Sequence, residues 1–499
     1  MQRIGGVARW ALGVGRWALG VARCALGVGR WTQAAAAGLP AGLLASRVVE
    51  GAGFIAVAVS APALIAAPAV PQERGPRWMS GSSAPPLPRR AGVILPAMQT
   101  AAAIVIGAGA FGASTAYHLA RRGADVVLVD QHAIGSQTSA RAAGLTSKTA
   151  STPVMAALRH EACEAFERFD SELGRSVDFH RSGSLKAAYT EAGEARLRAD
   201  LAIARRLGIE ARFISANEAH ALAPHFKPGA ARAIGYVPSD GWLDPAKVAP
   251  GFAARAAELG ARVLPFTRVT ELLQAQGRVK GIATGSGEIH APVVVDAAGG
   301  WSRSIAASAG IRLPLLPVRH QLYITQPIAG VEPLQPIVRL LEASVYVRYA
   351  DGGLMFGGYE DAPQVVEPER LPAAFQISDL PLDLGVLRAL TDEVAAHFPV
   401  LKSAAVAVHR GGLPTMTPDG HPIVGPVPGL DGFYIASGCC VGGLSLSPAS
   451  GRALADLILE GKSEPDLASL FVERFRGWAE RPAELTAKCL ERYGRKYMK

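Results

Sequence analysis

The fold is decided by the stretch Ile104-Val105-Ile106-Gly107-Ala108-Gly109-Ala110-Phe111-Gly112, where a β-branched run ends directly in the spacing G-x-G-x-x-G. Residues 113–120 follow with a helical pattern, and residues 125–130 form a second apolar run that ends in an aspartate. This order predicts a strand, a tight turn, a helix and a second strand. A glycine-rich turn in another kind of α/β protein is the alternative.

Each glycine of this motif has its own expected role in binding a dinucleotide. Gly107 makes the tight turn, Gly109 lets the backbone approach a pyrophosphate, and Gly112 lets helix and strand pack closely. The N-terminus of the helix then directs unpaired N–H groups at the phosphates. Asp130 ends the second strand, where a carboxylate can accept hydrogen bonds from the adenosine ribose. The unit therefore predicts a dinucleotide-binding α/β domain.

The charge of the chain is unevenly distributed. The 499 residues carry a formal net charge of +9 and are enough for two or three domains. Residues 1–97 hold ten Arg and two Glu, whereas the remainder holds 41 basic and 40 acidic residues. The near-neutral body argues against a nucleic-acid partner. The five cysteines show neither Cys-x-x-Cys nor metal-ligand spacing, so we expect no metal site and a reducing compartment.

The first 97 residues differ from the rest. A seven-residue unit, Arg-Trp-Ala-Leu-Gly-Val-Gly at 9–15, recurs with small changes at 16–22 and 23–29, and residues 51–70 are uncharged. Three interpretations compete: a targeting segment, a membrane anchor, or translation that starts at Met98. We favour the third, exclude residues 1–97 from the fold prediction as a leader, and expect a cytoplasmic protein. A real targeting segment would instead make it mitochondrial or membrane-associated.

The body alternates strands and helices. Helices are predicted over 153–173, 191–207 and 245–259, and strands over 260–264, 269–273, 279–284 and 289–295. Residues 313–400 alternate short strands and loops, which predicts an inserted antiparallel sheet. A strand over 433–438 then leads through a glycine turn into a helix over 449–460.

Three motifs fall in a telling order along the chain. These are G-A-G-A-F-G-A-S-T-A, then D-A-A-G-G-W-S, then T-P-D-G-H-P-I-V-G-P followed by G-G-L-S-L-S-P-A-S-G. Together they resemble, over about residues 101–475, the D-amino-acid oxidase-like family of FAD-dependent amine and amino-acid oxidoreductases. The resemblance is nearest to the branch of sarcosine and dimethylglycine dehydrogenases, sarcosine oxidase β subunits and D-amino-acid dehydrogenases.

The resemblance implies an α/β (α+β) fold, in which a discontinuous Rossmann-like FAD-binding domain is interleaved with an antiparallel β-rich substrate domain. The FAD-binding domain would take residues 98–180, 240–310 and 405–475, and the substrate domain residues 181–239 and 311–404. Residues 476–499 would form a C-terminal helical tail.

The resemblance also implies the residues that hold FAD. Relatives that bind flavin covalently use a His or a Cys where this chain has Arg141 and Gly412, so we expect FAD to be bound non-covalently. Cys439 and Cys440 lie near the expected flavin site, and we interpret both as packing residues. The expected FAD-binding residues are Gly107, Ala108, Gly109, Ala110, Phe111, Gly112, Asp130, Gln131, Ser139, Ala143, Gly144, Leu145, Val269, Ala297, Ala298, Gly299, Gly442, Gly443, Leu444 and Ser445.

Oxidation of an amine by a flavin requires three things of the protein. A cation must hold the substrate carboxylate, for which Arg348 is the first candidate. A polar group must help to remove the amine proton, and His320 and Tyr323 are the candidates. Donors must face the negative charge on the flavin, which suits the N–H groups that begin the last predicted helix. Lys148 is an undecided further candidate beside the ring.

The predicted function is FAD-dependent oxidation of the C–N bond of a small amino acid or secondary amine, of the sarcosine, N-alkylglycine or D-amino-acid type, by hydride transfer to flavin N5. The electron acceptor would be oxygen, a quinone or an electron-transfer protein. The alternative is a flavin-binding subunit of a larger amine dehydrogenase or oxidase complex, inactive without its partner. An NAD-dependent dehydrogenase and a non-enzymatic nucleotide-binding protein are weaker alternatives.

Overall fold

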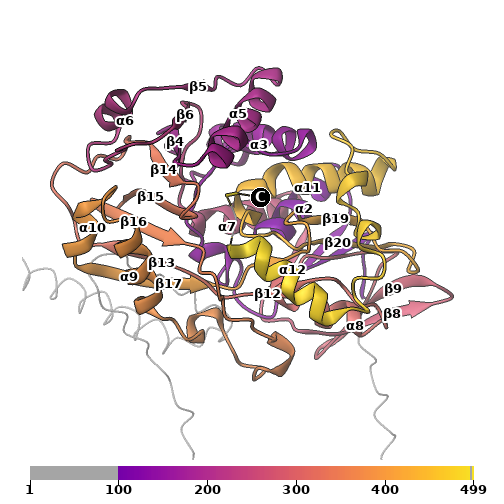
Figure 1. Cartoon of the computed structure of the whole chain (residues 1–499). Coiled ribbons are helices and arrows are strands. Elements are labelled where there is room, and N and C mark those ends of the chain that lie inside the picture. The colour runs from indigo at the N-terminus through magenta and orange to yellow at the C-terminus, as the bar shows by residue number, and fades with distance from the viewer. Residues whose placement is uncertain (1–98, 495–496, 499) are drawn as a thin grey trace, which may run out of the picture. The chain divides into compact units, whose positions relative to one another are not determined.

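A mostly parallel six-stranded sheet forms the base of the fold in the computed structural model, which describes residues 99–494 and 497–498 (Figure 1). The predictions for residues 1–97 lie outside the described residues. The strand order is β19-β20-β11-β2-β3-β7, and only β19 runs antiparallel to its neighbour. The bounds are β2 Ala103–Ile106, β3 Val126–Val129, β7 Arg262–Leu264, β11 Val293–Asp296, β19 Ile423–Pro426 and β20 Phe433–Ser437.

Helices cover this sheet, and their caps agree with the sequence. The helix α2, Ala110–Arg121, packs between α7, Pro245–Glu258, and α11, Gly443–Glu460 (Figure 1). Asp244 caps α7 as predicted, because its Oδ1 accepts from the backbone N–H of Ala246 at 2.9 Å. The predicted helix over 153–173 is divided into α3, Pro153–Glu167, and α4, Phe169–Leu173.

One predicted strand is wrong. The apolar run 289–295 belongs to two strands in two sheets, β10 (Gly287–His290) and β11, because Pro292 has no N–H for a ladder hydrogen bond. β10 lies in a four-stranded sheet of order β1-β10-β9-β8. The other bounds in this sheet are β1 Gln99–Thr100, β8 Val269–Ala275 and β9 Arg278–Thr284.

A second sheet of eight strands lies beside the six-stranded sheet (Figure 1). Its order is β17-β13-β16-β15-β14-β4-β6-β5, antiparallel except where β14 pairs with β4. The segment 313–400 therefore supplies the middle of a larger sheet rather than a sheet of its own. The bounds are β4 Ser184–Ala188, β5 Arg212–Phe213, β6 Ala233–Val237, β13 His320–Thr325, β14 Ile337–Leu340, β15 Val345–Ala350, β16 Gly353–Gly358 and β17 Val406–Gly412.

The last long helix begins earlier than predicted. α11 starts at Gly443 rather than Ala449, with Pro448 inside it. Pro448 cannot donate to the carbonyl of Leu444, and the Ser447 hydroxyl donates to that carbonyl at 2.9 Å instead. The remaining elements are α5 Glu191–Arg206, α6 Ala216–Leu222, α8 Ser302–Ala307, α9 Leu384–Glu393, α10 Pro399–Ser403, α12 Pro482–Gly494, and the short pair β12 Leu316–Pro317 and β18 Thr415–Met416.

The predicted mixed α/β class is confirmed by these sheets and helices, whereas the domain boundaries stay a prediction. Within the described part of the chain, no helix combines the length and the apolar character that crossing a bilayer requires.

The crossing of α2 and α11 gives a test of the packing. A Cβ on Gly451 would lie 2.3 Å from Ser114 Oγ and 2.8 Å from the Ser114 carbonyl carbon. Gly451→Ala should therefore lower the free energy of unfolding by about 1–3 kcal/mol, although alanine is the better helix former. Gly494→Ala is the control, because its Cβ would make ordinary contacts at 3.5 Å. Equal unfolding midpoints for both variants in urea, followed by circular dichroism, would contradict this packing.

Candidate functional site

A long cleft runs from the carboxyl ends of β2, β3 and β11 to the eight-stranded sheet. Open α/β sheets bind ligands at this edge. One end of the cleft is lined by the glycine motif and Asp130, and the other by His320, Tyr346 and Tyr359. A single cleft therefore joins the expected cofactor residues to side chains of the antiparallel sheet.

Two glycines make the first end of the cleft possible. Gly107 has φ +97°, and a Cβ there would lie 2.5 Å from the carbonyl oxygen of Ala297. A Cβ on Gly112 would lie 1.8 Å from the carbonyl oxygen of Gly107. Only glycine fits at both positions, so the N-terminus of α2 comes directly against the sheet edge. The free N–H groups of that helix end can then bind phosphate.

Asp130 and Ser139 hold this turn from the side. Asp130 Oδ2 accepts from the N–H of Ala108 at 2.7 Å, and Oδ1 accepts from the N–H of His132 at 2.7 Å. Burial raises the pKa of the Asp130 carboxyl, while the two backbone donors act in the opposite direction. Ser139 Oγ accepts from the N–H of Ala110 at 3.0 Å. Both side chains line the cleft, and each Asp130 oxygen keeps a second lone pair for a ligand hydroxyl.

A strained turn forms the flavin side predicted from the sequence. Cys440 and Val441 have φ +45° and +65°, which β-branched Val rarely adopts. This turn ends at Gly442, the N-cap of α11, so the N–H groups of the next residues have no partner within the helix. Gly443, Leu444 and Ser445 line the cleft beside Ala143, Gly144 and Leu145.

The structure brings most of the predicted cofactor residues to this cleft. The exceptions are Ala108, which supplies an N–H to Asp130, Gly112, which lies within the helix packing, and Gly442. Cys439 also lines the cleft, whereas Cys440 is buried. Lys148 is buried and lines neither this cleft nor the neighbouring cavity, so it is no candidate for ring contact.

His320 is held in one orientation by two tyrosines. Its Nδ1 lies 2.8 Å from Tyr493 Oη, and its Nε2 lies 3.1 Å from Tyr346 Oη. The Tyr493 hydroxyl can donate to the carbonyl of Arg319 at 3.2 Å, and in that arrangement it accepts the proton that neutral His320 carries on Nδ1. In this tautomer of His320, Nε2 is the acceptor that faces Tyr346.

The structure places Tyr323 away from the cleft. Side chains three positions apart on a strand lie on opposite faces, and on β13 His320 faces the cleft. Tyr323 is fully buried on the other face, where its ring stacks on Phe356 and its hydroxyl lies 2.9 Å from Thr391 Oγ1.

Arg348 is also absent from the wall of the cleft. It is buried, its Nε donates to the carbonyl of Ala143 at 2.8 Å, and its guanidinium carbon lies 4.7 Å from the Trp242 ring centroid. Arg410 on β17 lines the cleft instead, with Nη2 donating to the carbonyl of Ala142 at 3.0 Å. Its Nε, and that of Arg141 on the same wall, have no partner among the described residues.

Sequence reasoning missed Arg410, Tyr346, Tyr359 and Tyr493. The alternation of β15 offered one signal, because Tyr346 and Arg348 share a face and either could reach the site. No sequence signal pointed to Arg410 or Tyr493. Arg410 reaches the cleft through the pairing of β17 with β13, and Tyr493 reaches His320 because α12 packs against this part of the fold.

Comparisons with known proteins agree with this geometry. Residues 102–457 match the model of the family DAO, described as FAD dependent oxidoreductase. The chain is 31% identical over 404 residues to the mitochondrial dimethylglycine dehydrogenase of Mus musculus, covering 78% of this chain and 46% of that protein. It is 30% identical over 410 residues to the mitochondrial sarcosine dehydrogenase of Homo sapiens, covering 81% of this chain and 44% of that protein.

A solved structure is similar as well. The crystal structure of L-proline dehydrogenase from P. horikoshii superimposes with a TM-score of 0.69 at 26% identity, covering 77% of this chain and 99% of that chain. The chain thus spans less than half the length of the two curated relatives but matches the whole of this solved chain.

The cleft fits FAD by its own residues. Gly107 and Gly112 leave the backbone open where a pyrophosphate would bind, since a Cβ at either position would clash. The remaining lone pairs of Asp130 can accept hydrogen bonds from ribose hydroxyls. Gly443, Leu444 and Ser445 would then face the ring with their N–H groups.

Asp130 gives the test of this assignment. Asp130→Ala should weaken FAD binding by roughly tenfold to a hundredfold, because two or more hydrogen bonds to a carboxylate are lost. Asp125→Ala is the matched control, since Asp125 precedes the same strand but is exposed and paired with Arg262. Titration of the apoprotein with FAD, followed by tryptophan fluorescence, measures both. Equal dissociation constants for the two variants would remove Asp130 from the cofactor site.

Proposed function

Since the chain belongs to the DAO family of FAD-dependent oxidoreductases, we propose that it oxidises the C–N bond of a small amino acid or secondary amine, such as an N-alkylglycine or a D-amino acid. The observation that carries this proposal is the fixed His320–Tyr346 pair, which lines the same cleft as the flavin-side residues. When bound, FAD supplies the acceptor, since flavin N5 takes the hydride from the carbon that bears the nitrogen.

The pair at His320 is suited to remove the amine proton. A substrate ammonium must become neutral before the C–H bond can break with its electron pair. Burial raises the pKa of the Tyr346 phenol, so this group stays protonated. Tyr346 therefore acts as a relay: its hydroxyl accepts a proton from the substrate nitrogen as it donates its own to His320 Nε2. Through its contact with Nδ1, Tyr493 supports the tautomer of His320 in which Nε2 is the acceptor.

Arg410 takes the carboxylate-binding role first assigned to Arg348. It lines the cleft, and its Nη2 donates to the carbonyl of Ala142. Its Nε has no partner among the described residues, so this edge of the guanidinium group has donor capacity left for a carboxylate. Arg348 instead holds the carbonyl of Ala143, and so it positions the loop on which the ring would rest.

The N-terminus of α11 completes the site. Its N–H groups at Gly443 to Ser445, together with the helix dipole, would stabilise negative charge that develops on bound FAD. Oxygen, a quinone or an electron-transfer protein remains the predicted final acceptor. A flavin-binding subunit that works only with a partner chain is the second candidate.

Removal of one hydroxyl tests the relay. Tyr346→Phe should lower kcat/KM for an oxidised amine by roughly a hundredfold or more, the usual size of a lost proton-transfer contact. Tyr323→Phe is the control, since it removes a hydroxyl from the opposite face of the same sheet. Both are measured by dye-linked turnover with a panel of N-methyl and D-amino acids. A Tyr346→Phe enzyme as active as the Tyr323→Phe enzyme would refute the relay.

The mode of FAD attachment gives a second test. The positions at which relatives attach flavin hold Arg141 and Gly412, neither of which offers a nucleophile at neutral pH. Acid precipitation should therefore release all of the flavin into the supernatant, where its fluorescence is measured. Flavin fluorescence that stays with the precipitated polypeptide would show a covalent bond and would point to Cys439 on the cleft wall.

A further inference from the structure

A second cavity adjoins the cleft and shares part of its wall. Leu145, Tyr359, Cys439, Val441 and Ser445 line both spaces. Leu145 and Ser445 are among the expected flavin-binding residues, and the ring centroid of Tyr359 lies 4.8 Å from that of His320. The two spaces therefore lie side by side, with Tyr359 at their boundary.

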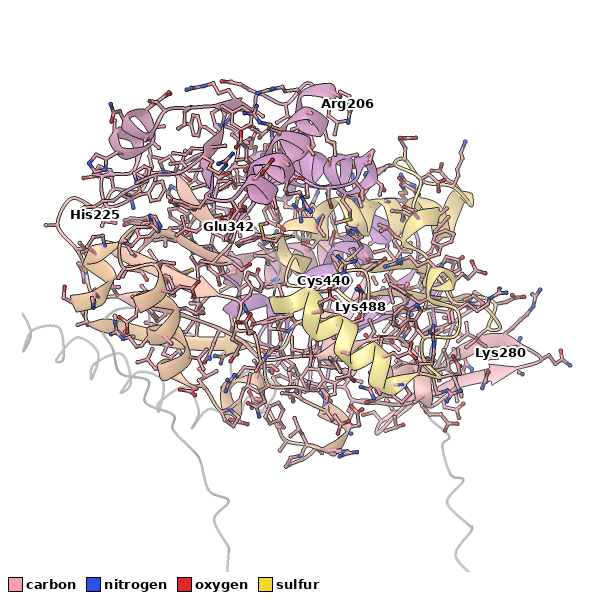
Figure 2. The ribbon with its side chains drawn as sticks, in the orientation of Figure 1. Arg206, His225, Lys280, Glu342, Cys440 and Lys488 are labelled. Carbon is pink, nitrogen blue, oxygen red and sulfur yellow. The ribbon has the colours of Figure 1, made fainter. Side chains whose placement is uncertain are left out.

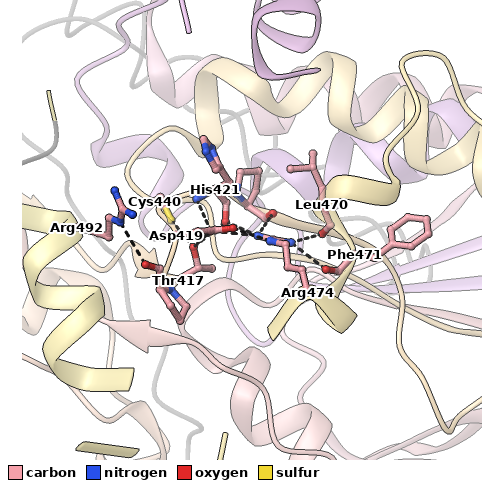
Figure 3. A network of polar contacts seen from close by, with 10 residues as sticks. Thr417, Asp419, His421, Cys440, Leu470, Phe471, Arg474 and Arg492 are labelled. Atoms are coloured by element: carbon pink, nitrogen blue, oxygen red, sulfur yellow. Dashed lines mark hydrogen bonds and ion pairs between the residues drawn. The ribbon is translucent and has the colours of Figure 1, made fainter. Parts of the chain in front are cut away.

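The cavity is rich in positive charge. Five cationic side chains line it, and the two carboxylates on the wall are already in use. Asp419 is paired at 2.7 Å with Arg474, which lies outside the wall (Figure 3). Asp200 accepts from Arg196 at 3.0 Å and lies 4.0 Å from Lys186. The five cations are Arg159, Lys186, Arg196, Arg339 and Arg492.

Two of these guanidinium groups are incompletely satisfied. Arg339 is 5% exposed and donates from Nη2 to the carbonyl of Thr146 at 3.2 Å, while its Nη1 has no partner among the described residues. Arg159 Nε likewise lacks a partner there. The pKa of Lys186 is lowered to about 8, mainly by burial. The wall thus holds five cations against two carboxylates, and buried positive charge in excess of its counter-ions is costly, which is the condition that a bound anion relieves.

The register of the eight-stranded sheet connects these cations to the reacting centre. Tyr346 pairs with Arg339, and Arg339 pairs with Lys186 on the next strand. Residues paired across neighbouring strands share a face, so all three side chains leave the same side of the sheet. With strands about 4.8 Å apart, the Cα atoms of Arg339 and Lys186 lie about 5 and 10 Å from that of Tyr346.

The same row continues in the opposite direction. Tyr346 pairs with Gly357, which pairs with Leu322, which pairs with Arg410. A Cβ on Gly357 would lie 2.2 Å from Tyr346 Oη, so the tyrosine ring leans over this glycine toward Arg410. Along this row of the sheet, Tyr346 therefore has Arg410 on one side and Arg339 and Lys186 on the other.

We propose that the substrate is an amine with two acidic groups, one held by Arg410 and the other, remote from the reacting C–N bond, by Arg339 and Lys186. This inference rests on the proposed function, because it names the substrate class for the same reaction. The oxidised bond and the hydride acceptor are unchanged. The second cavity adds only binding energy and specificity for the remote acid.

Two substrates of equal size test the proposal on the holoenzyme. N-methylglutamate and N-methylglutamine differ only in a carboxylate against an amide, so their kcat/KM ratio isolates the remote charge. The ratio should exceed roughly tenfold in favour of the acid. In Lys186→Met it should fall by roughly tenfold or more, and Lys186→Arg should restore it. A ratio near one in the native enzyme, or a ratio that Lys186→Met does not change, would overturn the proposal.

Lys280→Met is the matched control. Lys280 is exposed on β9, far from Cys440 of the cavity wall (Figure 2), so its loss changes net charge equally without touching the cavity. The ratio of the two substrates should stay at its native value in this variant. An equal fall in Lys280→Met and Lys186→Met would mean that overall charge, not the cavity, selects the acid, and would refute the proposal.

A binding measurement separates this inference from the proposed function. Glutarate has both acids but no amine, and calorimetry of the holoenzyme reports its dissociation constant without turnover. Binding that weakens by roughly tenfold in Lys186→Met, while no amine is oxidised, would keep the two-acid site and reject the proposed oxidation. Inorganic phosphate that binds through Lys186 where glutarate does not would show a free-anion site and reject the substrate assignment.

Discussion

The site depends on the close approach of two backbone segments at the end of the parallel sheet. Gly107 turns at φ +97° against the carbonyl of Ala297, and the N–H of Ala297 donates to the carbonyl of Ile106 at 2.8 Å. Because neither contact leaves room for a side chain, the turns that follow β2 and β11 form one continuous cradle. The N-terminus of α2 borders this cradle, and Asp130 holds its backbone by accepting from the N–H of Ala108. The shape of this cradle is set by the main chain, and Asp130 adds hydrogen-bond acceptors to it.

The chemistry depends on a second constraint, the alternation and register of the eight-stranded sheet. His320, Tyr346 and Arg410 come from three strands, and strand pairing alone brings them to one face. The C-terminal helix α12 returns over this face and supplies Tyr493, which fixes the proton on His320 Nδ1. A segment more than 150 residues from His320 in sequence thereby sets which nitrogen can accept a proton.

Much of the fold was predictable because its signals are local. The glycine spacing, the Asp244–Pro245 helix start and the terminal acid of the second strand each express a rule within a few residues. Two of the differences in element bounds involve proline. Pro292 divides one apolar run between two sheets, whereas Pro448 is accepted inside α11 because Ser447 satisfies the carbonyl that it leaves. The residue type alone could not distinguish these outcomes.

The residues at the His320 end of the cleft were harder to predict, because the register of the eight-stranded sheet cannot be deduced from the sequence of a single strand. His320 faces the cleft, and strict alternation along β13 places Tyr323 on the opposite face. Arg348 was a sound choice by residue type, yet Arg410 lines the cleft, and only the pairing of β13 with β17 shows this. The binding roles of all these residues remain proposals that the geometry supports.

The central claim is that this chain removes a hydride from the carbon beside an amine nitrogen and passes it to bound FAD. Anaerobic mixing of the FAD-loaded protein with sarcosine, dimethylglycine, proline, D-amino acids and N-methylglutamate tests it most directly. The account predicts that at least one of these amines bleaches the absorbance of the oxidised flavin. Folded, FAD-loaded protein whose flavin no amine reduces, although dithionite reduces it fully, would contradict the account.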